Sequence, residues 1–171
     1  IMMLIDFWQL ERHGEAIALI DEHGQALSFA ALALRADAAA AGLARGEVFA
    51  LSCAANAATV QVYLGALRCG AVPLMLDGGL AADASTALLA RYGIAQHFDG
   101  RTGTWQRCDN AAPGPAPHPD LALLLSTSGS TASPKLVRLS RANLAANAGS
   151  IADYLALGPT EVAITTLPLH Y

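Results

Sequence analysis

Short apolar runs without charge alternate with capped helical segments in the first half of the chain, and this alternation constrains the fold most. Val48–Cys53 and Val72–Leu76 have the length and composition of buried strands. Asn56 is placed to cap a helix over Ala57–Cys69, which lies between them. Strands that alternate with helices indicate βαβ units, and successive βαβ units build a parallel sheet with helices on its faces.

The same patterns predict the remaining elements. Helices are expected where Ser28, Asp83 and Ser140 can cap a first turn, and they are expected to stop near glycines. The predicted helices cover Asp6–Arg12, Phe29 to about Ala41, Asp83 to about Tyr92, and Ser140 to about Leu157; the predicted strands cover Ala16–Asp21, Gln25–Leu27, Ile94–Phe98, Leu121–Leu125, Lys135–Leu139 and Val162–Leu167. We therefore predict an α/β fold, a mostly parallel sheet with helices on both faces.

Composition favours one globular domain over the whole chain, residues 1–171. Apolar residues make up 54% of the sequence and charged residues only 14%, which is typical of a compact chain and not of a disordered one. The segment Asn110–Pro119 holds four prolines in ten residues and is predicted to be a stiff, extended linker within the domain.

Charge and hydropathy argue against two classes of partner. A net charge of −4 gives no support for binding nucleic acid or an anionic membrane. The uncharged stretch Val48–Leu67 approaches the length of a membrane span, but it contains four polar residues and Asn56 is placed as a helix cap. We expect no membrane span. The start of the sequence lacks the basic and long apolar regions of a secretory signal, so we expect a cytoplasmic protein.

Cysteines and histidines show no spacing typical of a metal site. Cys53, Cys69 and Cys108 are odd in number and lack CxxC spacing, as expected for thiols of a reducing compartment. The five histidines are scattered along the chain. We expect no metal site built from these residues.

The stretch after Leu121–Leu125 is the candidate functional motif. Residues 126–133 are small and mostly hydroxyl-bearing, and Lys135 next to them is the only lysine in the chain. Such a stretch offers many hydroxyl and backbone N–H donors beside one flexible positive charge, which suits a polyphosphate. A solvated turn has a similar composition, so the residue types alone leave both interpretations open.

A Walker A loop does not fit this motif. Counted from Gly129, Lys135 falls at the right distance for GxxxxGK[ST], but Pro134 stands at the second glycine and Leu136 replaces the Ser or Thr that would reach magnesium. Proline also removes a backbone N–H that a phosphate cradle uses. We therefore do not interpret this motif as the phosphate loop of a P-loop NTPase.

The sequence from Thr127 to Leu136, TSGSTASPKL, resembles the phosphate loop TSGSTGxPKG of the acyl-adenylate-forming (AMP-binding) superfamily. This superfamily includes acyl-CoA synthetases, the adenylation domains of peptide synthetases, and luciferases. Ala132 and Leu136 stand where the family pattern has glycine. A methyl group at Ala132 is unfavourable if the loop needs a positive φ there.

Other stretches resemble the family in the same order. They are Ala16–Leu32, Leu64–Leu74, Arg141–Leu155 and the LPLHY sequence Leu167–Tyr171, which is similar to the start of a PLFH-type motif. The family's later motifs, including a YGxTE-like segment and a distal catalytic lysine, are not in these 171 residues. The resemblance therefore implies the N-terminal part of a larger enzyme, and we expect these residues alone not to complete the reaction.

The resemblance implies an ATP-dependent ligase that activates a carboxylic acid as acyl-AMP and passes the acyl group to a thiol, either of coenzyme A or of a carrier protein's phosphopantetheine arm. It implies that Mg²⁺ is shared with residues outside this chain. The phosphate-binding residues that it implies are Thr127, Ser128, Gly129, Ser130, Thr131 and Lys135. His170 and Tyr171 are the candidates for the acyl pocket, with packing at a strand end as the other interpretation.

Two alternatives remain open from the sequence. The parent protein is a non-catalytic nucleotide-binding or interaction module if the changes at Ala132 and Leu136 abolish catalysis. It is an unrelated phosphate binder, such as a kinase, if Lys135 does not follow a buried strand and a loop.

Overall fold

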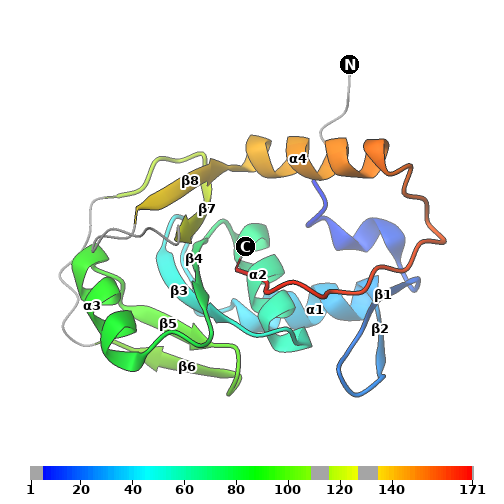
Figure 1. Ribbon diagram of the computed structural model, residues 1–171. Coiled ribbons are helices and arrows are strands. Elements are labelled where there is room, and N and C mark those ends of the chain that lie inside the picture. Colours follow the sequence, from blue (N-terminus) through cyan, green and yellow to red (C-terminus); the bar gives the residue numbers. More distant parts are fainter. Residues whose placement is uncertain (1–5, 109–115, 127–134, 171) are drawn as a thin grey trace.

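A six-stranded sheet forms the centre of the computed structural model, which describes residues 6–108, 116–126 and 135–170. A separate hairpin pairs β1 with β2 (Figure 1). The strands are β1 Ile17–Ile20, β2 Ala26–Ser28, β3 Val48–Cys53, β4 Val72–Asp77, β5 Gln96–Asp99, β6 Thr104–Arg107, β7 Leu121–Ser126 and β8 Leu136–Ser140. The helices are α1 Phe29–Ala39, α2 Ala57–Cys69, α3 Ala82–Tyr92 and α4 Arg141–Tyr154, preceded by the 3-10 helix η1 Leu10–His13.

Four parallel strands make up the middle of the sheet. The strand order is β6-β5-β3-β4-β7-β8, and β3 pairs in parallel with β4 and β5, as β4 does with β7. The edge strands β6 and β8 run antiparallel to their neighbours. The carboxyl ends of β3, β4, β5 and β7 therefore lie along one edge of the sheet. This arrangement confirms the predicted mostly parallel α/β sheet.

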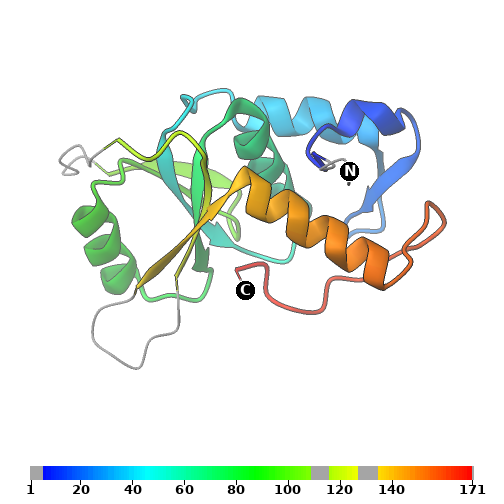
Figure 2. The same cartoon turned by 90° about the horizontal axis from the view of Figure 1, so that it is seen from above.

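Helices cover both faces of the sheet, as predicted. Successive strand residues point to opposite faces: Phe49 and Leu51 of β3 pack in a cluster with Val62 and Ala66 of α2, whereas Ala50 belongs to a cluster with residues of α3. Figure 2 shows α3 on one side of the strands and the pair α1 and α2 on the other. Helices on both faces explain why the middle strands consist almost entirely of apolar residues.

Side-chain caps fix where three helices begin. Ser28 and Asn56 accept hydrogen bonds from backbone N–H groups three residues on, at 3.1 and 3.0 Å. Ser140 forms a capping box with Asn143 at the start of α4. These three caps confirm the sequence predictions.

Several boundaries differ from the prediction. Asp83 does not cap α3, because the helix begins one residue earlier and Asp83 lies inside its first turn. The 3-10 helix η1 occupies only part of the helix predicted over Asp6–Arg12. The strand β6 was not predicted. The strand predicted over Val162–Leu167 is wrong for the described residues, where this segment lies exposed and has no partner strand.

Within the described ranges, no helix combines the length and the apolar character that crossing a bilayer requires.

Candidate functional site

The connection between β7 and β8 lies where the candidate phosphate-binding motif was predicted. Ala122, Leu123 and Leu124 of β7 are buried, so the motif follows a buried strand. β7 is parallel to β4 and pairs antiparallel with β8, with Ser126 opposite Leu136. β7 therefore ends, and β8 begins, at the carboxyl edge of the sheet. Ligands of open α/β sheets bind outside this edge.

The structure describes only some of the predicted binding residues. Lys135 lies directly before β8 and is exposed, and His170 is half-buried near the end of the chain. The remaining predicted residues, Thr127, Ser128, Gly129, Ser130, Thr131 and Tyr171, lie outside the described residues. The placement of Lys135 after a buried strand and a connecting segment is contrary to the topology that would favour a kinase-like phosphate binder.

Leu136 can replace the glycine of the family pattern without backbone strain. It is the first residue of β8, it is half-buried, and its side chain packs against the cluster that contains Leu76 and Leu124. Among the described non-glycine residues, only Ala156 has a positive φ. Because Leu136 has ordinary strand geometry, glycine is not needed at this position.

Backbone segments pack closely where β3 and β5 end. A Cβ atom added to Gly100, which follows β5, would lie 2.4 Å from Thr59 Oγ1 and 2.6 Å from the Ser52 carbonyl oxygen. The Asn56 amide also donates to the Gly100 carbonyl oxygen at 2.7 Å. A side chain at position 100 would therefore not fit between these strand ends.

A polar pair on neighbouring strands was not predicted. Ser52 Oγ and His97 Nε2 lie 2.7 Å apart on β3 and β5. Burial lowers the pKa of His97, which favours its neutral form, while the nearby Asp99 carboxylate opposes this shift. Neither Ser52 nor His97 lines the two cavities described below, so we assign this pair to holding the strands together.

An apolar cavity of about 300 Å³ lies against the α2 face of β4 and β7. Its walls come from the first turns of α2, from β4, β7, β8 and α4, and from Leu169, which precedes His170. The lining residues are Thr59, Val60, Tyr63, Met75, Leu123, Leu125, Leu139, Leu144, Asn147 and Leu169. Burial raises the pKa of Tyr63 to about 12, so its hydroxyl stays neutral. The described lining thus suits an uncharged, mainly apolar group.

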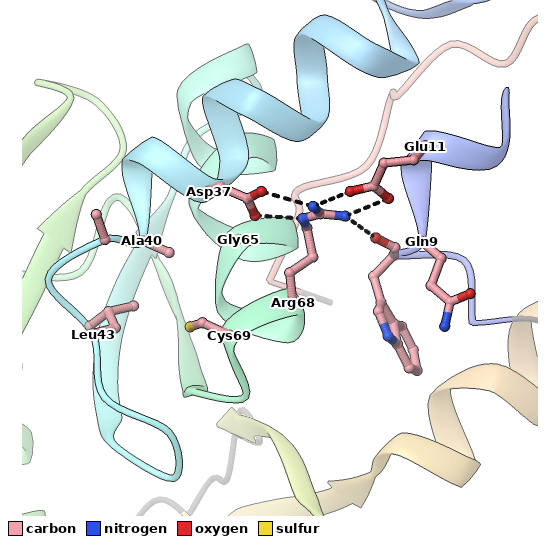
Figure 3. Close-up of a pocket in the computed structure, with 10 residues that line it drawn as sticks. Gln9, Glu11, Asp37, Ala40, Leu43, Gly65, Arg68 and Cys69 are labelled. Atoms are coloured by element: carbon pink, nitrogen blue, oxygen red, sulfur yellow. Dashed lines mark hydrogen bonds and ion pairs between the residues drawn. The ribbon is translucent and has the colours of Figure 1, made fainter. Parts of the chain in front are cut away.

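A larger hollow of about 540 Å³ lies between η1, the end of α1 and the end of α2 (Figure 3). Arg68 lies in its wall, and hydrogen bonds to Asp37, Glu11 and the Trp8 carbonyl oxygen use the five N–H donors of its guanidinium. α2 runs away from the carboxyl edge, so its last turn lies towards the opposite edge of the sheet. The larger hollow is therefore remote from the candidate phosphate site.

Among the described residues, no group of three or more His, Cys, Asp or Glu side chains is arranged to hold a metal ion.

The sequence matches the family model described as "AMP-binding enzyme" over residues 7–102 and 95–171. The two matches together extend over nearly the whole chain. The chain belongs to the AMP-binding enzyme family. This assignment confirms the resemblance drawn from the Thr127–Leu136 motif.

Two curated proteins illustrate the relationship to other AMP-binding enzymes. A sulfoacetate–CoA ligase from Cupriavidus necator is 31% identical, in an alignment that covers 90% of this chain and 37% of the relative. The phosphinothricin tripeptide synthetase PhsB from Streptomyces viridochromogenes is 30% identical, over 95% of this chain and 16% of the relative. The chain thus spans little more than a third of the first relative and a sixth of the second.

Solved structures of this family share the fold. Apo MatB from Rhodopseudomonas palustris matches with a TM-score of 0.78 and 22% identity, over 99% of this chain and 41% of that chain. The o-succinylbenzoate–CoA synthetase MenE from Bacillus subtilis, solved with AMP, matches with a TM-score of 0.76 and 22% identity, over 98% of this chain and 50% of that chain. At such identities the likeness shows that the fold is common to them.

Proposed function

We propose that this chain is the N-terminal part of an ATP-dependent ligase that activates a carboxylic acid as an acyl adenylate and transfers the acyl group to a thiol. The observation that carries the proposal is the position of the TSGSTASPKL sequence. In a chain of the AMP-binding enzyme family, this sequence joins a buried parallel strand to β8 at the carboxyl edge of the sheet.

The donor-rich motif suits the triphosphate of ATP. Thr127, Ser128, Ser130 and Thr131 supply hydroxyl and backbone N–H donors to the β- and γ-phosphates, with the Gly129 backbone close by. Lys135 adds a positive charge at the start of β8, where it is exposed. A hydrogen bond to a charged group contributes about 1.5–3 kcal/mol, so a few such donors hold a triphosphate. Mg²⁺ is shared with residues outside this chain.

The reaction has two steps. A carboxylate oxygen attacks the α-phosphorus of ATP, pyrophosphate leaves, and an acyl adenylate forms. A thiol, of coenzyme A or of a carrier protein's phosphopantetheine arm, then attacks the acyl carbon and AMP leaves. Negative charge accumulates as the carboxylate approaches the phosphates, so positioning and positive charge at the loop accelerate the first step.

The apolar cavity next to Leu169 is the place that we propose for part of the acyl group. It adjoins β7, which leads into the phosphate-binding motif, and its lining residue Leu169 precedes His170 and Tyr171 in sequence. His170 and Tyr171 then lie beside the carboxylic acid. Ala132 supports a second candidate function, a nucleotide-binding module without catalysis, because it departs from the family's glycine.

Exchange of radiolabelled pyrophosphate into ATP tests the function in the full-length protein. We expect exchange to require a carboxylic acid, found by screening a panel of acids, and to fall about 10- to 100-fold in Lys135→Ala, equivalent to one lost charged hydrogen bond. Arg138→Ala is the matched control, because Arg138 is an exposed basic residue on the same strand.

Two outcomes of these measurements would contradict the proposal. Exchange that is unchanged in Lys135→Ala would show that Lys135 is not a phosphate ligand. If calorimetry shows ATP binding but no acid of the panel supports exchange, the protein is a non-catalytic nucleotide-binding module and not a ligase.

A further inference from the structure

Lys135 carries the only side-chain amine in the chain, because the nine other basic residues are all arginines. Lysine and arginine differ in reactivity: the neutral amine of lysine is a nucleophile, whereas the guanidinium of arginine stays protonated and does not attack carbonyl carbons. Lys135 is exposed and directly precedes β8, which begins at the carboxyl edge of the sheet. The chain therefore places its one amine nucleophile beside the proposed phosphate site.

The alternation of side chains along β8 puts position 135 on the face of the sheet that carries the apolar cavity. Successive strand residues point to opposite faces. Leu139 lines the cavity, and Val137 is paired with Leu125, which also lines it. Position 135 is the next in this series, about 7 Å along the chain from Val137. Val137 is 40% exposed, so this face is open to solvent between the cavity and Lys135. The four-carbon stem of lysine lets its amine reach back over most of this distance.

The three thiols of the chain are not placed to compete with this amine. Cys53 is buried, and burial raises its pKa to about 12, so its thiolate is scarce. Cys69 lines the larger hollow, near the opposite edge of the sheet. The Cys108 N–H donates to the Ala95 carbonyl oxygen, just before β5 begins, so Cys108 also lies at the amino edge. Among the described amines and thiols, only Lys135 is both exposed and at the carboxyl edge.

We propose that Lys135 is a self-acylation site, modified by the acyl adenylate that the protein itself makes; this inference rests on the proposed function. The adenylate is a mixed anhydride with an electrophilic acyl carbon. The neutral amine of Lys135 attacks this carbon, an amide bond forms, the bond from the acyl carbon to the phosphate oxygen breaks, and AMP leaves while the amine nitrogen loses a proton. Pyrophosphate departs before this step, so the amine is no longer occupied by the phosphates that it bound.

Acylation of Lys135 switches off the step that produces the adenylate. It converts a positively charged side chain into a neutral amide, so the charge that the proposed function assigns to Lys135 is lost. The thiol acceptor consumes the adenylate in the second step and therefore competes with Lys135 for it. The modification accumulates when the acid and ATP are present without a thiol, and it then limits the production of adenylate that has no acceptor.

Peptide mass spectrometry after treatment of the full-length protein with synthetic butyryl adenylate tests the site without requiring ligase activity. The probe has a short apolar acyl group, which suits the apolar cavity of about 300 Å³. Arg138→Lys is the matched control, because it places a lysine at an exposed position of the same strand with the side chain on the opposite face. In this variant we expect acylation at Lys135 to be at least about 10-fold faster than at position 138. Equal rates would show that any exposed lysine reacts from solution, and would overturn the proposal.

The time course of pyrophosphate exchange tests the consequence for activity. The full-length protein is incubated with ATP and an acid that supports exchange, without a thiol, and we expect exchange to fall in parallel with the unmodified fraction of Lys135. Lys135→Arg keeps the positive charge but forms no amide, so the exchange rate that it starts with should stay constant. Steady exchange with Lys135 unmodified would overturn self-acylation and leave the ligase intact. Absence of exchange with every acid would instead overturn the proposed function, and the butyryl adenylate measurement would still decide whether Lys135 is the acylated residue.

Discussion

Arg68 on α2 grips the carboxylate of Asp37 on α1 with two parallel hydrogen bonds, from Nε to Oδ1 at 2.6 Å and from Nη2 to Oδ2 at 2.8 Å. The same guanidinium also donates to Glu11 of η1 and, at 2.9 Å, to the Trp8 carbonyl oxygen. One side chain therefore joins three elements that are distant in sequence (Figure 3).

Replacing Arg68 with lysine should destabilise the protein although the charge is kept. Lysine lacks the planar guanidinium group that donates hydrogen bonds to Asp37 and to Glu11 at the same time, so most of these hydrogen bonds are lost. We expect a loss of about 1–2 kcal/mol in the free energy of unfolding, measured by urea denaturation. Arg35→Lys, at an exposed position on α1, is the control and should change stability by less than about 0.5 kcal/mol. Equal effects would mean that the fork geometry is unimportant.

Protonation of the Glu11 carboxylate should lower the stability of the protein in acid. Its hydrogen bond with Arg68 lowers the pKa of Glu11 from 4.5 to about 2. Because the folded-state pKa is the lower one, this contribution is fully present above pH 4.5 and is lost as the pH falls towards 2. The effect is small, since the Glu11 side chain is 62% exposed. Melting temperatures between pH 2 and 6 should show that Glu11→Gln removes this part of the acid dependence; parallel curves would contradict the assignment.

The contact between α1 and α2 should not tolerate a side chain at Gly65. A Cβ atom there would lie 2.1 Å from the Ala36 carbonyl oxygen, which is backbone and cannot move alone. We expect Gly65→Ala to lower the free energy of unfolding by about 3 kcal/mol. Gly149→Ala in α4 is the matched control: its Cβ would meet nothing within 4 Å, so it should stabilise the protein by about 0.5–1 kcal/mol. Chemical denaturation of both variants decides whether the close approach matters.

The cysteines should differ in their reactivity. Cys53 is buried in β3, and burial raises its pKa to about 12, so almost no thiolate is present at neutral pH. Cys69 is exposed at the end of α2. We expect iodoacetamide at pH 7.5 to modify Cys69 at least about 100-fold faster than Cys53, as followed by peptide mass spectrometry. Comparable rates would show that the core around β3 opens readily.

Local sequence signals predicted the parts of the fold that depend on local chemistry. Ser28, Asn56 and Ser140 begin helices because a hydroxyl or amide oxygen can accept the unpaired N–H groups of a first turn. Gly70 and Gly93 end helices with φ values of 85° and 63°, which favour glycine.

Elements that depend on distant partners could not be predicted in this way. β6 is a short edge strand, and its four residues are all exposed and show no apolar alternation. The glycines at 100 and 103, in the turn before it, were the available signal for a hairpin. The segment 162–167 has the composition of a strand, but a strand also needs a neighbour, and the described residues supply none.

Only some of the elements around the candidate site could be predicted, for the same reason. A buried strand that leads into a donor-rich motif is a local pattern, and the structure places β7 and Lys135 accordingly. The apolar cavity is lined by residues of α2, of three strands, of α4 and by Leu169. These elements lie next to one another only because of the order of the strands in the sheet. No spacing in the sequence indicates such a set.

The order of strands in the sheet has a consequence for synthesis on the ribosome. Residues 48–107 contain β3 to β6, which are adjacent in the sheet, whereas β7 and β8 attach later to the free side of β4. The ribosome synthesises the N-terminal part of a chain first, so these four strands are able to pair before Leu121 has been translated. The hydrogen-bonding edge of β4 then stays unprotected until the polypeptide has lengthened by a further segment, and in this interval the nascent chain is most exposed to aggregation.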